Sequence, residues 1–453
     1  MTLLDSLRSG AATVAGAFTA IGDSYAWAAQ EDRRALGALE HDLPLIAERL
    51  KAWAQHENPE PVFAVLRELK PVLVLGEMAL VTRFEDVQEV LSRPDAFGVT
   101  YAAKFAELTG GRNFFLGMDG DARYTRDVSN MRLAVRREAI ASRVAPVVTR
   151  AAESIVDAAG GRLDVVRELG VGAPEALAAE YFGTPSPTPG DYATWSATMS
   201  GYLFLPPSGG NAATQGKAVA QAGLMRAALA RTLAERRARG DDRDDVLGRC
   251  LAMQRAGLPG MDDETLLVNL FGIVIGALPT TGALLALAID ELLRRPAALA
   301  QAQMAARAGA TRLVWQYMAE ALRFNPLGPG VFRVALDDYE VAGGTPHATT
   351  IPRGTTVLAS LSSAMMAGRR VDDPHVVKGD RPEWQYMHFA YGLHTCFGQY
   401  LNLAQLPLLA TALLRRRNLR RAEGAAGALR KDGPFPSALV VEYDVESGAE
   451  SGA

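Results

Sequence analysis

Residues 389–398 read Phe389-Ala390-Tyr391-Gly392-Leu393-His394-Thr395-Cys396-Phe397-Gly398. This stretch holds Cys396, one of the two cysteines of the chain, and directly precedes an apolar, helix-prone run over residues 399–417. The thiolate is the form of cysteine that binds metals, and the free N–H groups and dipole of a helix N-terminus stabilise its negative charge. Gly392 and Gly398 flank the cysteine, and glycine lets a backbone turn tightly or approach a ligand closely. The residues therefore predict a metal-binding thiolate; the alternative is a buried free cysteine that acts as a small hydrophobe.

The whole stretch is more specific than the cysteine alone. It resembles the cysteine loop of the cytochrome P-450 family, Phe-x-x-Gly-x-His/Arg-x-Cys-x-Gly, and every fixed position of that pattern is filled. The resemblance implies a haem b whose iron is held by the Cys396 thiolate, an arrangement that favours cleavage of the O–O bond. It also implies that Phe389, Gly392 and Gly398 shape the haem-binding loop. His394 could hydrogen-bond a haem propionate.

The composition is that of an ordinary globular protein. The chain has 453 residues, of which 49% are hydrophobic, so a large core can form. Its formal net charge of −4 gives no reason to expect a nucleic-acid partner. Cys250 lies far from Cys396 in the sequence, so the two do not make a disulfide framework, and a reducing compartment fits. We therefore expect a cytoplasmic protein in which Cys250 is structural or incidental.

The pattern of elements divides the chain into two parts. Residues 1–45 look helical and predict an N-terminal extension. Asp5, Arg8 and Asp23 interrupt its apolar residues, so we expect neither a membrane span nor a signal peptide there. Residues 46–453 are expected to form a single domain. The family resemblance implies that this domain is mainly α with small β-sheets, the P-450 fold.

The resemblance also suggests where substrate enters and binds. Helices expected over residues 192–204 and 214–239 flank a Pro/Gly-rich loop and match the mobile lid of the family. The candidate pocket segments are largely apolar and comprise residues 100–115, 202–207 and 271–277. Within them Lys104 or Arg112 could steer a substrate carboxylate, and a solvent-facing role is the alternative.

A long apolar run over residues 265–289 predicts a helix that crosses the core. Polar residues interrupt the run and no basic segment precedes it, which favours a buried helix over a membrane span. The resemblance places this helix over the haem. Relatives there usually carry Ala/Gly-Gly-x-Asp/Glu-Thr, whose acid and alcohol deliver protons to bound dioxygen. This chain instead reads Gly276-Ala277-Leu278-Pro279-Thr280-Thr281.

Pro279 stands where the family has its acid. Proline lacks an N–H and clashes with a carbonyl one turn back, so we expect it to kink the helix. The freed carbonyl, near Ile275, could hold a water over the iron, and Thr280 or Thr281 could still donate to oxygen. The candidate catalytic residues on this side of the haem are Gly276, Ala277, Pro279, Thr280 and Thr281.

Three functions remain open from the sequence. The first is a monooxygenase that hydroxylates an apolar small molecule or a fatty acid with O2. We recognise no flavin or iron–sulfur domain, so its electrons would come from a separate ferredoxin and reductase. The second is a peroxide-driven peroxygenase or a fatty-acid hydroperoxide isomerase, although the peroxygenases pair an arginine with the proline and that position is Leu278 here. The third is a non-catalytic haem sensor or carrier.

Two further sets of residues match the scaffold of the family. Glu320 and Arg323 share one helix face, since they are spaced i and i+3. The resemblance implies that this pair is buried and locks with a third residue, Arg381. Arg333 lies on a strand expected over residues 331–335 and would reach a haem propionate; an exposed strand position is the alternative.

One basic helix matches the family less well. Tyr124 falls where relatives often place a propionate-binding histidine, and Val128 where they place an arginine. Arg126 lies between them, and Arg123 and Arg132 are further candidate substitutes. A solvated basic face is the alternative for each arginine. We therefore expect Tyr124 and Arg126 near the cofactor.

Overall fold

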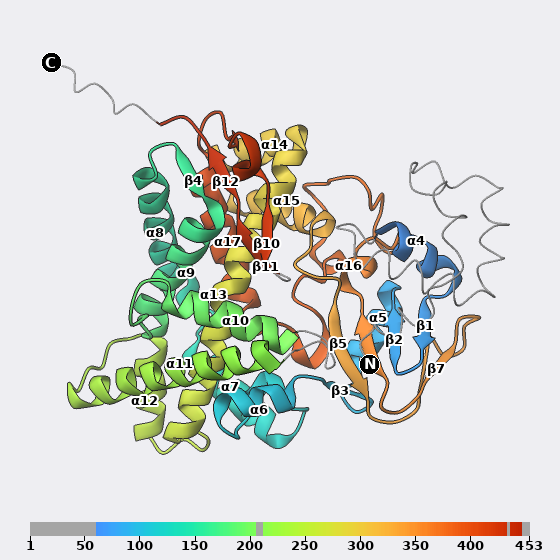
Figure 1. Cartoon of the computed structure of the whole chain (residues 1–453), viewed down its shortest axis with the longest axis horizontal. Helices are drawn as coiled ribbons and strands as arrows, with labels where there is room; N and C mark the ends of the chain where they lie inside the picture. Colours follow the sequence, from blue (N-terminus) through green and yellow to red (C-terminus); the bar gives the residue numbers. More distant parts are fainter. Residues whose placement is uncertain (1–59, 205–211, 433–434, 446–453) are drawn as a thin grey trace.

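The computed structural model describes residues 60–204, 212–432 and 435–445 (Figure 1). The predicted extension over residues 1–45 lies outside the described residues. The α-helices are α4 (Glu60–Leu69), α5 (Phe84–Ser92), α6 (Ala102–Thr109), α7 (Ala122–Ala134), α8 (Ala145–Ala158), α9 (Gly170–Leu177), α10 (Asp191–Phe204), α11 (Ala212–Ala238), α12 (Val246–Arg255), α13 (Asp263–Arg294), α14 (Pro296–Arg307), α15 (Thr311–Phe324), α16 (Leu361–Ala364) and α17 (Gln399–Leu414). Short 3-10 or π-helical turns are η1 (Phe115–Gly117), η2 (Ile140–Val144), η3 (Val165–Leu169), η4 (Ala178–Phe182), η5 (Glu383–Gln385), η6 (Gly392–His394) and η7 (Gly424–Gly427).

The strands are β1 (Val72–Leu75), β2 (Met78–Val81), β3 (Phe97–Val99), β4 (Arg162–Asp164), β5 (Val331–Ala335), β6 (Tyr339–Val341), β7 (Thr349–Ile351), β8 (Thr356–Ala359), β9 (Arg420–Arg421), β10 (Arg430–Asp432), β11 (Phe435–Ala438) and β12 (Val440–Glu442). The largest sheet has the order β1-β2-β8-β5-β3, in which β2 and β8 are parallel and the other neighbours are antiparallel. Smaller sheets are β4-β12-β9, β10-β11 and β6-β7. The prediction of a mainly α fold with small β-sheets is confirmed.

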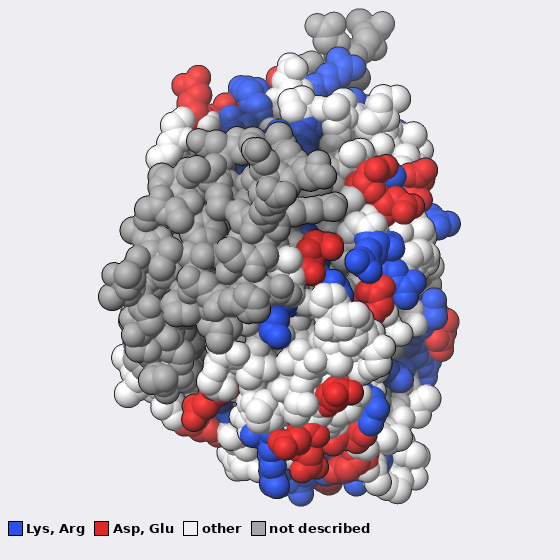
Figure 2. All heavy atoms as spheres, turned by 90° about the vertical axis from the view of Figure 1, so that its right-hand side faces the viewer, with Lys and Arg blue, Asp and Glu red and all other residues white. Residues whose placement is uncertain are grey.

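The five-stranded sheet lies at one side of the molecule and most helices lie at the other (Figure 1). Seen from the sheet side, Lys and Arg side chains are interspersed with Asp and Glu over the described part of the surface (Figure 2). Mixed signs of this kind suit a protein of small net charge.

Helix α13 runs through the middle of the helical region (Figure 1). Its neighbours α9, α10, α11 and α17 pack around it, which explains why its sequence is apolar on almost every face. Among the described residues it is the one helix long and apolar enough to cross a membrane, and 72% of its apolar window is buried inside the protein. The prediction of a core helix over residues 265–289 is confirmed.

One buried acid makes the stability of the fold dependent on pH. Asp86 on α5 is 6% exposed, and its Oδ2 has no hydrogen-bond partner within the described structure. Burial raises its pKa from 3.8 to about 6, a shift that the positive charge of Arg83 opposes and the negative charges of Glu89 and Glu85 reinforce. Because the folded protein binds this proton more tightly than the unfolded chain, Asp86 favours folding below pH 3.8. That contribution is lost as the pH rises through 6.

We expect Asp86→Asn to raise the free energy of unfolding by about 1–3 kcal/mol at pH 8, since about two pKa units separate the folded and unfolded states. The gain should shrink as the pH falls through 6 toward 4. Urea unfolding curves of the two proteins across this range measure it. Asp337→Asn, which changes an exposed carboxylate, is the control. An equal gain at every pH would contradict the assignment.

Candidate active site

Cys396 lies in the loop between η6 and α17. The backbone N–H of Cys396 donates to the carbonyl of Phe389 at 2.9 Å, which closes the loop. Burial raises the pKa of the Cys396 thiol above its ordinary value, while hydrogen bonds from the backbone N–H groups of Gly398 and Gln399 oppose the shift. The start of α17 therefore already donates to the sulfur, and a bound cation would supply the remaining stabilisation of the thiolate.

The backbone conformation of the cysteine loop explains why residue 392 is a glycine. Gly392 has a φ of +73°, and a Cβ atom there would lie 2.1 Å from the carbonyl oxygen of Leu91 on α5. No L side chain fits such a position, so glycine is required. Ala390 also has a positive φ, 60°, which is a strained conformation for a residue other than glycine. Backbone strain of this kind is common at functional sites, and here it lies in the cysteine loop.

Two buried nitrogen groups next to this loop lack an anionic partner. His394 is 8% exposed and its Nδ1 makes no hydrogen bond to the described residues. Burial lowers its pKa to about 4, and the positive charge of Arg333 adds to the shift. Arg333 on β5 is 3% exposed, donates to the carbonyl of Phe332 at 2.8 Å, hydrogen-bonds the Tyr101 hydroxyl, and pairs with no carboxylate in the described part of the chain. The alternative of an exposed strand position for Arg333 is wrong.

This pair of groups fits a haem. A buried guanidinium normally carries an anion, because an unpaired buried charge costs several kcal/mol. Haem b brings two carboxylates and an iron that binds thiolate. Arg333 and the free Nδ1 of His394 can receive a carboxylate, and Cys396 can receive the iron. The donor set therefore matches the group that the sequence predicts.

Tyr124 and Arg126 lie on α7 but face different surroundings. The Tyr124 hydroxyl donates to the carbonyl of Leu393 at 2.6 Å, and its ring meets the His394 ring edge-on with centroids 5.4 Å apart. Arg126 instead pairs with Asp127 at 2.8 Å and packs against Gly260. The structure thus brings Tyr124 to the cysteine loop and leaves Arg126 paired elsewhere. Arg123 also approaches Asp127, and Arg132 is exposed.

The middle of α13 carries a face that borders open space. Gly276 is exposed, and a Cβ atom there would meet nothing within 4 Å. Ala277, Pro279 and Thr280 are partly exposed, although the helix is otherwise mostly buried. The Thr280 hydroxyl donates to the carbonyl of Gly276. These residues form the open face of α13.

Thr281 is not on that open face. It is fully buried and its hydroxyl donates to Oδ1 of Asn402 on α17 at 3.1 Å. The reason is helical geometry, since consecutive residues point about 100° apart around the axis. The Ile275 carbonyl, for which we expected a water, accepts a long 3.5 Å hydrogen bond from Ser200 on α10. The hydrogen-bonded helix continues through Pro279 from Asp263 to Arg294.

Aromatic rings connect the cysteine loop to α13. Phe397 lies 5.1 Å from Phe115 between ring centroids, and Phe115 lies 4.0 Å from Phe114. The Phe114 ring occupies the space beside Gly272, where a Cβ atom would lie 2.3 Å away. These contacts form an apolar path from Phe397, the residue after Cys396, to Gly272 on α13.

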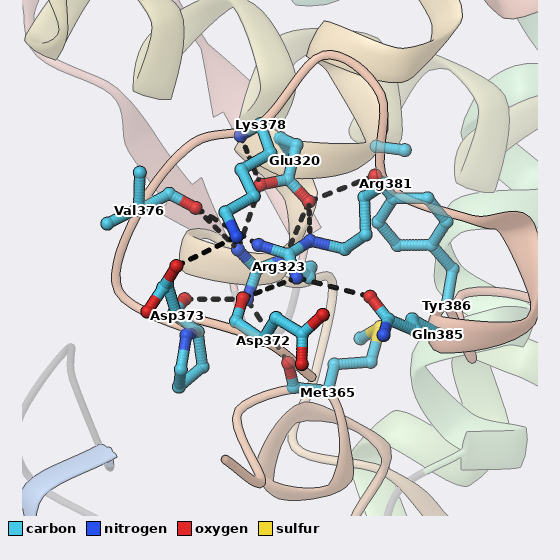
Figure 3. Close-up of polar contacts among 12 residues, drawn as sticks. Glu320, Arg323, Met365, Asp372, Asp373, Val376, Lys378, Arg381, Gln385 and Tyr386 are labelled. Carbon is cyan, nitrogen blue, oxygen red and sulfur yellow. Dashed lines mark hydrogen bonds and ion pairs between the residues drawn. The ribbon is translucent and has the colours of Figure 1, made fainter. Parts of the chain in front are cut away.

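The predicted scaffold residues Glu320, Arg323 and Arg381 are buried, and Figure 3 shows their polar contacts. Nε and Nη2 of Arg323 donate to the two oxygens of Glu320 at 2.8 and 2.9 Å, and Nε of Arg381 donates to Glu320 Oε1 at 2.9 Å. The Tyr386 hydroxyl and the backbone N–H of Lys378 also donate to Glu320, both at 2.9 Å. Burial raises the pKa of Glu320, but hydrogen bonds and charge from Arg323 outweigh it and the net pKa lies below 4.5.

Aromatic side chains and His388 connect the Glu320 cluster to the cysteine loop. His388 hydrogen-bonds the carbonyl of Ala319 at 2.9 Å and stacks on Tyr386. Trp315 stacks on Phe389, the first residue of the loop, with centroids 5.9 Å apart. Sequence reasoning missed Tyr386 as a partner of Glu320, since no local pattern marks it.

The predicted lid helices are α10 and α11, and the loop between them, residues 205–211, lies outside the described residues. Lys104 on α6 donates to the carbonyl of Tyr202 at 2.9 Å, and the Tyr202 hydroxyl donates to Glu107 at 2.6 Å. Arg112 pairs with Asp262 and Glu264, each at 3.1 Å. Both bases considered for a substrate carboxylate thus have partners within the protein.

Comparison with known proteins agrees with this geometry. The sequence model described as Cytochrome P450 matches residues 72–426. Nocardicin C N-oxygenase from Nocardia uniformis subsp. tsuyamanensis is 28% identical over 379 residues, covering 79% of this chain and 87% of the relative. Cytochrome P450 monooxygenase PikC from Streptomyces venezuelae is 26% identical over 371 residues, covering 79% and 84%.

Solved structures show the same fold. CYP109E1 from Bacillus megaterium, in complex with testosterone, has a TM-score of 0.71 at 18% identity, covering 86% of this chain and 100% of that chain. P450BioI in complex with hexadec-9Z-enoic acid ligated acyl carrier protein has a TM-score of 0.73 at 18% identity, covering 85% and 98%. The matched sequence model and the oxygenase relatives assign the class of enzyme. The chain belongs to the cytochrome P450 family and is a monooxygenase that uses haem with a cysteine thiolate ligand to the iron.

Proposed function

We propose that Cys396 is the thiolate ligand of the haem and that Arg333 and His394 hold its carboxylates. The observation that carries this proposal is the convergence of an unpartnered His394 Nδ1 and a buried Arg333 without a carboxylate beside the cysteine loop. Cys250 is the only other cysteine of the chain. It is fully buried and burial raises its pKa to about 12, which disfavours a metal-binding thiolate.

Thr280 would hold a proton at the open face of α13. Bound haem supplies the activation of dioxygen and the insertion of one oxygen atom into substrate. The Thr280 hydroxyl lies on this face and donates its hydrogen to the Gly276 carbonyl, so it would have to exchange that bond to deliver a proton. Pro279 provides no carboxylate and no N–H. Proton delivery in this chain would therefore depend on Thr280 and solvent instead of an acid–alcohol pair.

We infer that the substrate is an apolar small molecule or a fatty acid. Ala277 on the open face is apolar, and Lys104 and Arg112, the bases considered for a substrate carboxylate, have partners within the protein. Two solved relatives bind apolar molecules, a steroid in one and a fatty-acyl group on a carrier protein in the other. These observations support an apolar substrate without selecting one.

A separate ferredoxin and reductase would supply the electrons. Tyr400, in the first turn of α17, is 45% exposed, and the guanidinium of Arg137 lies 4.0 Å from its ring centroid. Arg132 and Arg136 are exposed in the same stretch of chain as Arg137. A basic surface next to the thiolate helix would suit an acidic electron carrier. Both cysteines are free, which is consistent with the reducing cytoplasm that we propose as the location.

One comparison of oxidants tests the reaction. Fatty acids and small aromatic compounds are supplied with ferredoxin, reductase and NADPH, or with hydrogen peroxide, and fatty-acid hydroperoxides are supplied alone. We expect hydroxylated product from the electron-transfer system, with one product oxygen derived from O2. Product formed only from hydroperoxide would overturn the monooxygenase assignment for this chain. Turnover under none of these conditions would revive the sensor or carrier alternative.

A further inference from the structure

Pro279 leaves α13 without one main-chain hydrogen bond next to Thr280. Proline has no N–H, so the carbonyl of Ile275 loses the donor that an ordinary helix would provide. The carbonyl instead receives the long hydrogen bond from Ser200. The helix nevertheless continues on both sides of this position. Contacts from neighbouring helices can compensate for the missing bond.

Three neighbouring helices hold α13 around the proline. Ser200 contacts it from α10, as described. Gly170, at the start of α9, lies so close to Gly282 that a Cβ atom at Gly282 would be 2.5 Å from the Gly170 carbonyl oxygen. From α17, Asn402 and Gln405 contact Thr281. Pro279 therefore lies between the Ser200 contact at Ile275 on one side and the contacts at Thr281 and Gly282 on the other.

The contact with α17 is a closed ring of hydrogen bonds. Thr281 Oγ1 donates to Asn402 Oδ1 at 3.1 Å, and Gln405 Nε2 donates to Thr281 Oγ1 at 3.1 Å and to Asn402 Oδ1 at 2.7 Å. All three side chains are buried. Buried amides and hydroxyls are costly when they lose their partners, so this ring resists rotation or sliding of α13 against α17.

The ring connects the two sides of the proposed site. Thr281 directly follows Thr280, and Asn402 lies in the first turn of the helix that begins after Cys396. Because consecutive helix residues point about 100° apart, fixing Thr281 toward α17 fixes the direction of Thr280 toward the open face. We propose that Thr281, Asn402 and Gln405 are positioning residues that hold α13 across Pro279 and thereby orient Thr280 relative to the thiolate helix. The inference rests on the proposed roles of Cys396 and Thr280.

The proposal predicts that the ring matters because of the proline. Thr281→Val keeps the shape of the side chain and removes the hydroxyl, whereas Thr281→Ser keeps the hydroxyl. In Pro279→Ala/Thr281→Val the restored N–H can bond the Ile275 carbonyl again. Gln405→Met opens the same ring from α17. Thr411→Val is a matched control, because Thr411 also lies on α17 but donates to the Pro407 carbonyl within its own helix.

Hydrogen exchange of the backbone amides measures how firmly α13 is held in its helical conformation. We expect amides over residues 271–284 to exchange about tenfold faster in Thr281→Val and Gln405→Met, the effect of losing roughly one hydrogen bond. Thr281→Ser and Thr411→Val should match the wild type, and the double variant should recover most of the protection. Equal exchange in wild type and Thr281→Val, or no recovery in the double variant, would overturn the proposal.

The infrared C–O stretch of the reduced carbonyl complex measures the orientation of Thr280. We expect one narrow band in wild type and Thr281→Ser, and a broadened or split band in Thr281→Val that narrows again in the double variant. A band that is the same in all four proteins would exclude the positioning role even if exchange changed. Failure of the haem assignment itself would be distinguishable, because the exchange experiment needs only folded protein.

Discussion

Arg323→Ala is expected to abolish haem incorporation. Arg323 is buried with Glu320 and Arg381, and its guanidinium also donates to the carbonyls of Met365 at 3.1 Å, Pro374 at 2.7 Å and Val376 at 3.2 Å. It therefore ties α15 to the segment that leads into the cysteine loop (Figure 3). Alanine would leave a cavity, remove one partner of Glu320 and remove the donor from three carbonyls, of which that of Met365 is buried.

The stability lost in Arg323→Ala is large enough to prevent haem binding. Removing one partner of a buried ion pair costs about 3–5 kcal/mol, which is a large part of a total stability of about 5–15 kcal/mol. The lost contacts lie on α15, which also contacts the cysteine loop. Its Trp315 stacks on Phe389, and His388, next to Phe389, hydrogen-bonds the α15 backbone. We expect a protein that retains helical circular dichroism in part, with a haem-to-protein ratio close to zero.

The measurement is the haem content of the purified protein beside its circular dichroism. Arg370→Ala is the matched control, because Arg370 precedes the same segment but pairs with Glu85 on the surface, where an ion pair contributes little. Arg370→Ala should bind haem as the wild type does. Stoichiometric haem in Arg323→Ala would show that the cluster is not needed for the site.

Much of the fold and part of the site were predictable because their signals are local. The apolar run that became α13 and the strand β5 follow from the pattern of residues along the chain. Glu320 and Arg323 were predictable as a pair because helix geometry alone places i and i+3 on one face. Arg381 was found only through the resemblance, since nothing in its own neighbourhood marks it.

The polar contacts between distant segments were not predictable. Thr281 looked equivalent to Thr280 in the sequence, but its partners Asn402 and Gln405 belong to α17 and only the fold brings them together. Likewise, the carbonyl freed by Pro279 meets Ser200 of α10. Arg126 pairs with Asp127 at the next position, a contact that the sequence prediction for this residue did not include. Such outcomes depend on packing between elements, which the order of residues does not encode locally.

Cys396→Ala is expected to remove the thiolate ligand and with it the monooxygenase activity. The sulfur is the group toward which Gly398 and Gln399 donate, and alanine offers nothing that can bind iron. Arg333 and His394 would remain, so some haem should still bind through its carboxylates. Product formation with the electron-transfer system should fall to background. Cys250→Ala is the matched control and should retain activity, because Cys250 lies buried in α12.

The reduced carbonyl spectrum tests the central claim most directly. Wild type and Cys250→Ala are expected to show the strongly red-shifted Soret band typical of thiolate-bound haem, and Cys396→Ala should bind carbon monoxide without that band. Folded, haem-loaded wild-type protein without the red-shifted band, or a Cys396→Ala variant that keeps it, would contradict ligation of the iron by Cys396.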